Sequence, residues 1–471
     1  RRYNGLAVKM TKKYDVIIVG GGPAGIFAAL ELVPDDLKIL LIEEGRDIDK
    51  RQCPARDTGL PCPPCKPCNL VCGLGGAGAF SDGKLTLTSR VGGRLPGYLG
   101  EEQTEALIKY VDEVYLKFGA PDKLYGTGKK VDKLRNQADL AGLKLVPMPV
   151  RHLGTDHCRQ VLKGMWDYLN PRIESRLRTS VASINVEKGR VKGVKTESGE
   201  SFGCDYLILA PGREGADWLA NEAERLKLTM HSNPVDVGVR VEVPAAVMAP
   251  LTDVLYESKL EFLSKRFDDQ VRTFCMCPGG EVIMESTGGC DPVITVNGHS
   301  YAERKTENTN FALLVSTAFT KPFNQPIAYG RYLARLANIL SGGVLLQRLG
   351  DLMEGRRSTP ERIERGLTKP TLRNATPGDL SFALPYRYLT DLVEMLQAMD
   401  KLVPGVASHH TLLYGIEVKF YSSRPQLSPG LETEVGNMFA VGDGAGVSRG
   451  LIQASVSGVV AAREILGRTK H

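Results

Sequence analysis

The chain has 471 residues, of which 42% are hydrophobic and 24% charged, a composition near the globular average that excludes a disordered, collagen-like or coiled-coil protein. Its net charge of +6 is small for this length and no basic tract accompanies it, so nucleic acid is not an expected partner. No apolar run approaches the roughly 18 residues that span a bilayer, so we expect no membrane span and a cytoplasmic location.

An apolar run near the start of the chain is followed by a cluster of glycines. Residues 14–19 (YDVIIV) predict a buried strand, and residues 26–32 predict a helix. The turn between them matches G-x-G-x-x-G, whose glycines permit a tight turn, close approach of a pyrophosphate and packing of the helix on the strand. Because the helix N-terminus then faces the phosphates, the segment predicts a site for FAD or NAD. The expected contacts are Gly20, Gly22, Pro23, Ala24 and Gly25.

A second predicted strand, over residues 38–42, ends in an acidic residue. Glu43 lies 18 residues after Gly25, where an acid accepts hydrogen bonds from a ribose hydroxyl. Its negative charge favours an adenosine ribose without a phosphate.

Cysteines cluster directly after this segment. The spacing Cys-x-x-Cys-x-x-Cys-x-x-x-Cys over residues 62–72 is that of bacterial ferredoxins, although glycine follows the last cysteine where ferredoxins have proline. Four prolines, at positions 61, 63, 64 and 67, predict a stiff, irregular loop. Three interpretations stay open: a [4Fe-4S] cluster, a structural zinc held by four thiolates, or unligated thiols. The candidate ligands are Cys53, Cys62, Cys65, Cys68 and Cys72.

A glycine-rich loop over residues 73–83 follows the cysteines. Its glycines would let backbone amides approach a flavin or pyrophosphate closely, with nearby polar side chains as further contacts. The expected cofactor contacts are Gly75, Gly76, Ala77, Ser81, Asp82, Gly83 and Lys84.

Two later strands also end in glycine motifs. Residues 206–210 (YLILA) run into Pro-Gly-Arg, and the predicted strand 437–441 runs into Gly-Asp-Gly-Ala-Gly before a helix of small residues from about 450 to 466. This pattern resembles the second FAD-binding motif of the glutathione-reductase-type flavoproteins. The resemblance implies that the aspartate bonds the ribityl–pyrophosphate region and that the helix points its N-terminus at the flavin. It implies contacts from Gly212, Gly442, Asp443, Gly450 and Leu451.

Three longer strings carry a narrower resemblance: GGAGAFSDGK at 75–84, RTFCMCPGGE at 272–281 and NGHSY at 297–301. They resemble a little-characterised family of FAD-dependent dehydrogenases or oxidoreductases, over nearly the whole chain from Tyr14 to Ala462. The resemblance implies bound FAD and an α/β fold, in which a Rossmann-like FAD-binding domain of the glutathione-reductase type (GR2) carries an inserted α+β substrate or cap domain. We expect FAD-domain segments at 10–100, 150–234 and 408–471, a connector at 101–149 and the substrate/cap domain at 235–407.

Four residues outside the glycine motifs are the catalytic candidates. Cys275 and Cys277 are separated by one residue, so in a strand their thiols would share a face, either as a redox pair or as small buried side chains. Glu417 and Lys419 are expected to line the cavity, either as structural hydrogen-bond partners or as proton carriers.

No second complete nucleotide motif is present, so a separate NAD(P)H-binding domain is not expected. The predicted function is that of an FAD-dependent oxidoreductase that moves a hydride between the flavin and an unidentified small organic substrate. NAD(P)H or a ferredoxin-like protein is left open as electron partner. The alternatives are an iron–sulfur flavoprotein supplied by a ferredoxin-like partner, and a non-catalytic flavin-binding sensor or RNA-modification partner.

Overall fold

The computed structural model describes residues 12–53, 65–231, 233–287, 292–300, 305–317, 325–420 and 423–469. The chain divides into two compact units. The first unit is formed by Arg1–Asp122, His152–His231 and Ser422–His471, and the second by Lys123–Arg151 and Ser232–Tyr421.

The first unit is built on a mostly parallel sheet in the order β7-β2-β1-β10-β9-β8, with β22 added beside β10. β1, β2, β7, β10 and β22 run parallel, whereas β9 and β8 pair antiparallel. All five residues of β2 are buried, as expected for a parallel strand covered on both faces. The strands are β1 (Lys12–Val19), β2 (Ile39–Glu43), β7 (Glu174–Leu177), β8 (Val181–Glu187), β9 (Arg190–Thr196), β10 (Ser201–Leu209) and β22 (Met438–Ala440).

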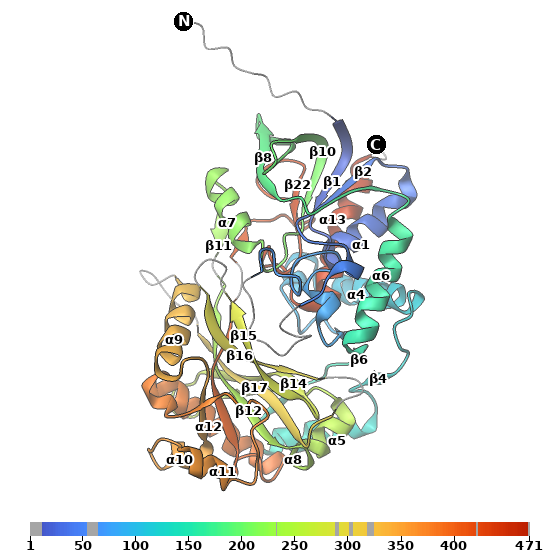
Figure 1. Ribbon diagram of the computed structural model, residues 1–471. Coiled ribbons are helices and arrows are strands. Elements are labelled where there is room, and N and C mark those ends of the chain that lie inside the picture. The colour runs from blue at the N-terminus through green and yellow to red at the C-terminus, as the bar shows by residue number, and fades with distance from the viewer. Residues whose placement is uncertain are drawn as a thin grey trace, which may run out of the picture. The chain divides into compact units, whose positions relative to one another are not determined.

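Helices α1 and α13 lie side by side in the first unit (Figure 1). Gly458 of α13 makes this close packing possible, because a Cβ there would lie 2.0 Å from the Ala24 carbonyl oxygen of α1. The helices of this unit are α1 (Pro23–Leu32), α3 (Leu95–Leu99), α4 (Glu101–Lys117), α6 (Gly154–Leu169), α7 (Ala216–Arg225) and α13 (Gly450–Thr469). Its short elements are η1 (Val33–Asp35), η2 (Ile48–Lys50), η3 (Ala77–Phe80), β3 (Lys84–Thr86), β11 (Met230–His231) and β21 (Arg424–Pro425).

The second unit is built on an eight-stranded sheet in the order β19-β18-β20-β12-β17-β14-β13-β5. Apart from the parallel pair β18–β19, neighbouring strands are antiparallel. The strands are β5 (Lys144–Val146), β12 (Val235–Pro244), β13 (Lys259–Leu263), β14 (Gln270–Cys277), β17 (Asn308–Thr317), β18 (Leu345–Arg348), β19 (Thr376–Pro377) and β20 (Leu412–Lys419). A separate hairpin is made by β15 (Glu281–Thr287) and β16 (Val293–His299), and β4 (Leu124–Tyr125) pairs with β6 (Val150–His152).

The central strand β12 has one apolar and one polar face. Its five valines, at alternate positions from 235 to 243, belong to a hydrophobic core shared with the helices of this unit. The intervening side chains of Asp236, Arg240 and Glu242 are fully buried on the opposite face. Because buried charge is costly unless paired, this second face has to contain a dense polar network. The helices are α5 (Lys129–Leu140), α8 (Ala245–Leu255), α9 (Pro326–Ser341), α10 (Leu349–Met353), α11 (Pro360–Glu364) and α12 (Tyr386–Leu402), with the short η4 (Leu380–Phe382).

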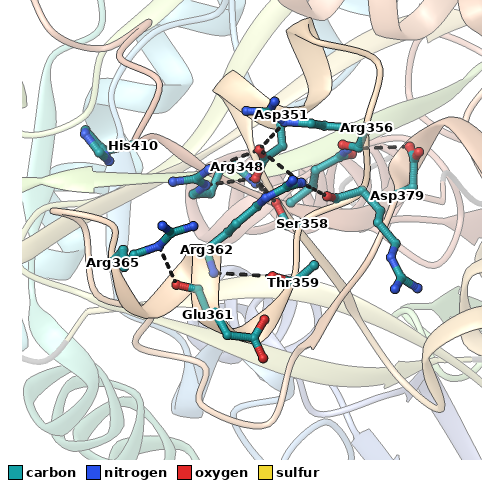
Figure 2. A network of polar contacts seen from close by, with 12 residues as sticks. Arg348, Asp351, Arg356, Ser358, Thr359, Glu361, Arg362, Arg365, Asp379 and His410 are labelled. Atoms are coloured by element: carbon teal, nitrogen blue, oxygen red, sulfur yellow. Dashed lines mark hydrogen bonds and ion pairs between the residues drawn. The ribbon is translucent and has the colours of Figure 1, made fainter.

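A buried aspartate holds α10 and α11 together in the second unit (Figure 2). The Asp351 carboxylate is fully buried and accepts hydrogen bonds from Arg348 Nε at 2.9 Å, Arg356 Nε at 3.0 Å and Ser358 Oγ at 2.8 Å. Thr359 begins α11 by accepting the Arg362 N–H. These contacts stabilise the segment between α10 and α11, which has few apolar residues of its own.

The mixed α/β architecture with a Rossmann-like first unit is confirmed. Among the described residues, no helix combines the length and apolar character required to cross a membrane.

Candidate functional site

The glycine turn after β1 is packed too closely for side chains. Gly20 has φ of +106°, and a Cβ there would lie 2.0 Å from the Ala210 carbonyl oxygen. A Cβ on Gly25 would lie 1.9 Å from the Gly20 carbonyl oxygen. α1 begins at Pro23, a residue suited to a first helical turn because it has no N–H to leave unpaired. The turn therefore brings the N-terminus of α1 to the end of the parallel sheet, the arrangement that binds phosphate.

The second glycine-rich loop lies directly on this turn. The Gly75 N–H donates to the Gly21 carbonyl at 2.8 Å, and a Cβ on Gly76 would lie 3.0 Å from the Gly22 Cα. Further along the loop, Lys84 Nζ pairs with the Asp82 carboxylate at 2.9 Å. The structure thus brings the two predicted glycine motifs together within the first unit.

Glu43 joins these two loops. Its carboxylate is 7% exposed. Oε1 accepts the N–H groups of Gly45 and Gly73, each at 2.8 Å, and Oε2 accepts that of Gly21 at 2.7 Å. Three charge-assisted bonds to backbone amides make Glu43 a structural link between the loops. Its contact with a ribose stays a prediction.

Arg51 is a residue of this site that the sequence did not single out. Its side chain is fully buried, its guanidinium lies 4.6 Å from the centre of the Phe80 ring, and burial lowers its pKa to about 10. The guanidinium donates to the backbone carbonyls of Asn69, Leu70, Gly73, Leu74 and Gly76, at 2.9, 2.8, 3.3, 2.7 and 2.8 Å. Glu43 therefore binds amides of the loop while Arg51 binds its carbonyls. An isolated arginine in a polar segment carries no periodic signal, which is why sequence reasoning missed it.

The third motif surrounds the start of α13. The Asp443 carboxylate accepts the Ser448 hydroxyl at 2.9 Å and the Gly450 N–H at 3.3 Å, and burial raises the pKa of Asp443. A Cβ on Gly444 would lie 1.9 Å from the Gly212 carbonyl oxygen, so the motif touches the loop after β10.

A small pocket opens beside the first turn of α13. Three of its lining residues, Lys84, Gly450 and Leu451, are predicted cofactor contacts from two distant motifs. The side-chain oxygen of Gln453, another lining residue, is buried without a hydrogen-bond partner. The remaining lining residues are Thr86, Val91, Arg449 and Ile452.

The polar face of β12 carries the second group of functional candidates. Arg240 and Glu417 are both fully buried and form a two-pronged ion pair, with Nε–Oε2 and Nη2–Oε1 distances of 2.8 Å. Arg240 also donates to the Cys275 carbonyl at 2.6 Å and to the Asn297 side-chain oxygen at 3.0 Å. Arg240, which the sequence did not single out either, thus connects the predicted candidates Glu417 and Cys275.

Lys419 is the partly exposed end of this network. Its side chain is 24% exposed, and Nζ lies 2.9 Å from Glu417 Oε1. Burial lowers the pKa of Lys419, but the carboxylates of Glu417 and Glu285 raise it by more, so the net shift is upward. The ammonium group therefore keeps its proton at neutral pH. Because Glu417 is paired with two cations, neither residue is suited to act as a general base.

The two cysteines of β14 lie beside Arg240. Cys275 is part-exposed and has φ of +31°, whereas Cys277 is buried. Their sulfur atoms lie within 4.8 Å of each other. All four sequence-predicted catalytic candidates are therefore gathered on one face of one sheet.

Comparison with known proteins identifies the family. A family profile described as FAD dependent oxidoreductase matches residues 15–308, more than half of the chain. The chain belongs to the FAD-dependent oxidoreductases. A second profile, described as FAD-dependent protein, C-terminal domain-like, matches residues 234–420 of this oxidoreductase.

Among similar proteins, an uncharacterized protein of Clostridium beijerinckii is 28% identical to this oxidoreductase over 476 residues, covering 96% of this chain and 80% of the relative. Among solved structures, 3-ketosteroid-Δ4-(5α)-dehydrogenase from Rhodococcus jostii RHA1 has a TM-score of 0.45 at 12% identity, with 98% of this chain and 99% of that one covered. L-proline dehydrogenase from P. horikoshii has a TM-score of 0.42 at 11% identity, covering 97% and 94%.

The first unit of this oxidoreductase fits its cofactor. The N-termini of α1 and α13 present backbone amides suited to phosphate and to a reduced flavin. A Cβ on Gly212 or Gly450 would meet no atom within 4 Å, which leaves space beside both motifs.

The cysteine cluster does not assemble a metal site among the described residues of this oxidoreductase. Cys62 lies outside them. No three of the other four candidate ligands bring their sulfurs within 4.8 Å of one another. The comparisons support neither the iron–sulfur interpretation nor the non-catalytic alternative.

Proposed function

We propose that this FAD-dependent oxidoreductase acts on a small organic substrate that carries an anionic group, and that Lys419 binds this group. The chemistry that FAD supplies when bound is transfer of a hydride to or from its ring system. The residues that would hold it are the Gly20–Gly25 turn, the loop from Gly75 to Lys84, and Asp443 with the first turn of α13.

One observation carries the choice of substrate class. Lys419 is protonated at neutral pH and is held by a buried carboxylate, yet its side chain retains 24% exposure. Within the described part of the chain, Glu417 occupies one of the three donors of this ammonium group. An ammonium ion fixed in this way presents its other donors in a constant direction, which suits a carboxylate or a similar anion.

Arg240 has a positioning role in this proposal. It cannot reach solvent, because its side chain is fully buried. Its two-pronged pair with Glu417 fixes the carboxylate against which Lys419 rests. The order of contacts is therefore Arg240, Glu417, Lys419 and then substrate.

The test is anaerobic reduction of the FAD-loaded protein by a panel of amino acids and 2-hydroxy acids, each compared with its methyl ester. We expect reduction by one or more acids and a loss of at least about tenfold in kcat/KM for the ester, since a charge-assisted hydrogen bond contributes about 1.5–3 kcal/mol. Lys419→Met should abolish the preference for the acid, whereas Lys401→Met, at an exposed position of the same unit, should retain it. Equal rates for acid and ester in the unaltered protein would refute the role of Lys419.

A further inference from the structure

The segment that carries Cys275 and Cys277 departs from a regular strand. In the pairing of β14 with β17, Phe274 faces Ala312 and Cys277 faces Asn310, so β14 advances by three residues while β17 advances by two. The extra residue makes a β-bulge next to Cys275, whose φ of +31° is unusual for any residue other than glycine.

The bulge brings the two thiols close together. In a regular strand, residues two apart are separated by about 6.6 Å along the strand. Here the sulfurs lie within 4.8 Å. A disulfide bond is about 2.05 Å long, so a relative movement of less than about 3 Å closes it.

Three basic side chains of the second unit interact with these thiols. Arg240 interacts electrostatically with both sulfurs, Lys419 with that of Cys275 and Lys305 with that of Cys277. Positive charge stabilises the thiolate, the form of cysteine that attacks disulfides. The two residues differ in access, because Cys275 is part-exposed and Cys277 is buried.

We propose that Cys275 and Cys277 form a redox-active dithiol that exchanges with low-molecular-weight disulfides. In the first step the Cys275 sulfur bonds to one sulfur of the small disulfide, whose S–S bond breaks, and the released thiolate takes up the proton that Cys275 has lost. In the second step the Cys277 sulfur attacks the Cys275 sulfur and releases the other small thiol, which takes up the Cys277 proton. The protein dithiol is oxidised by two electrons and the small disulfide is reduced to two thiols.

Three other cysteines are natural controls, because their surroundings oppose reaction. Burial raises the pKa values of Cys158 and Cys204 to about 12, and burial with neighbouring carboxylates does the same for Cys72. The proposal therefore separates one reactive pair from thiols that exist at neutral pH in the protonated form.

The experiment treats the full-length protein with oxidised glutathione, alkylates the remaining thiols with N-ethylmaleimide and analyses tryptic peptides by mass spectrometry. We expect the peptide that begins at Thr273 to lose alkylation at Cys275 and Cys277, to weigh two hydrogens less, and to regain both adducts after reduction. Cys204→Ser should leave this result unchanged.

Two single variants test the order of steps. Cys277→Ser should accumulate a stable glutathione adduct on Cys275, whereas Cys275→Ser should form none on Cys277. A thermal melt of each variant establishes that it is folded. If either variant is unfolded, the peptide analysis of the unaltered protein is the test. Full alkylation of both thiols after oxidation, or a disulfide to Cys290, which shares the tryptic peptide and lies outside the described residues, would overturn the proposal.

Discussion

Replacing Glu43 with glutamine separates its structural role from a role in ribose binding. The Glu43 carboxylate accepts three backbone N–H groups, two on Oε1 and one on Oε2. A glutamine whose oxygen replaces Oε1 keeps two of these bonds but turns its NH₂ group toward the Gly21 N–H. Loss of one charge-assisted bond, together with a buried donor left unpaired, costs about 3 kcal/mol.

The assay is urea denaturation of the FAD-free protein. Because no nucleotide is bound in that form, a residue that only contacts ribose contributes nothing to its stability, whereas a residue that joins the loops does. We expect Glu43→Gln to lower the denaturation midpoint with the slope unchanged. The matched control is Glu44→Gln at the exposed neighbouring position, which should change stability by less than about 0.5 kcal/mol. A Glu43→Gln protein as stable as this control would refute the structural role.

Two further predictions concern packing and acid stability. Gly458→Ala should lower the free energy of unfolding by about 3 kcal/mol, because its Cβ would lie 2.0 Å from the Ala24 carbonyl oxygen. Gly467→Ala is the control, because no atom lies within 4 Å of its Cβ. In thermal melts of both variants, Gly467→Ala should be neutral or stabilising. Asp351→Asn should cost about 3 kcal/mol at pH 7, because it breaks a buried ion pair. Burial raises the pKa of Asp351, but hydrogen bonds from Arg348, Ser358 and Arg356 lower it by more. The stabilisation by the Asp351 carboxylate is therefore present above its unfolded pKa of about 3.9 and is lost as pH falls below that value. The denaturation midpoints of Asp351→Asn and of the unaltered protein should converge in acid. A difference in midpoint that stayed constant down to pH 2 would contradict this prediction.

Local patterns predicted the nucleotide-binding elements well. The apolar run at 14–19 lies in β1 (Lys12–Val19), and the strand and helix expected near 437–441 and 450–466 correspond to β22 (Met438–Ala440) and α13 (Gly450–Thr469). These elements follow from periodicity and from glycine positions, which are readable within one short window.

Contacts between segments that lie far apart in the sequence could not be predicted from such local patterns. Arg51 and Arg240 each organise a site through contacts with residues far along the chain, and neither lies in a motif. The bulge at Cys275 depends on how β14 pairs with β17, so the strand pattern alone gave the shared face of the thiols but not their proximity. The partners of Glu43 likewise become visible only when the loops are folded against one another.

The most direct test of the account is the amount of FAD that the purified chain binds, measured from its visible spectrum and by release of the nucleotide after denaturation. We predict one FAD per chain and a sharp loss of binding in Gly25→Val, whose side chain would meet the Gly20 carbonyl oxygen. A chain that binds no FAD even after reconstitution, while folded by thermal melt, would contradict the central claim.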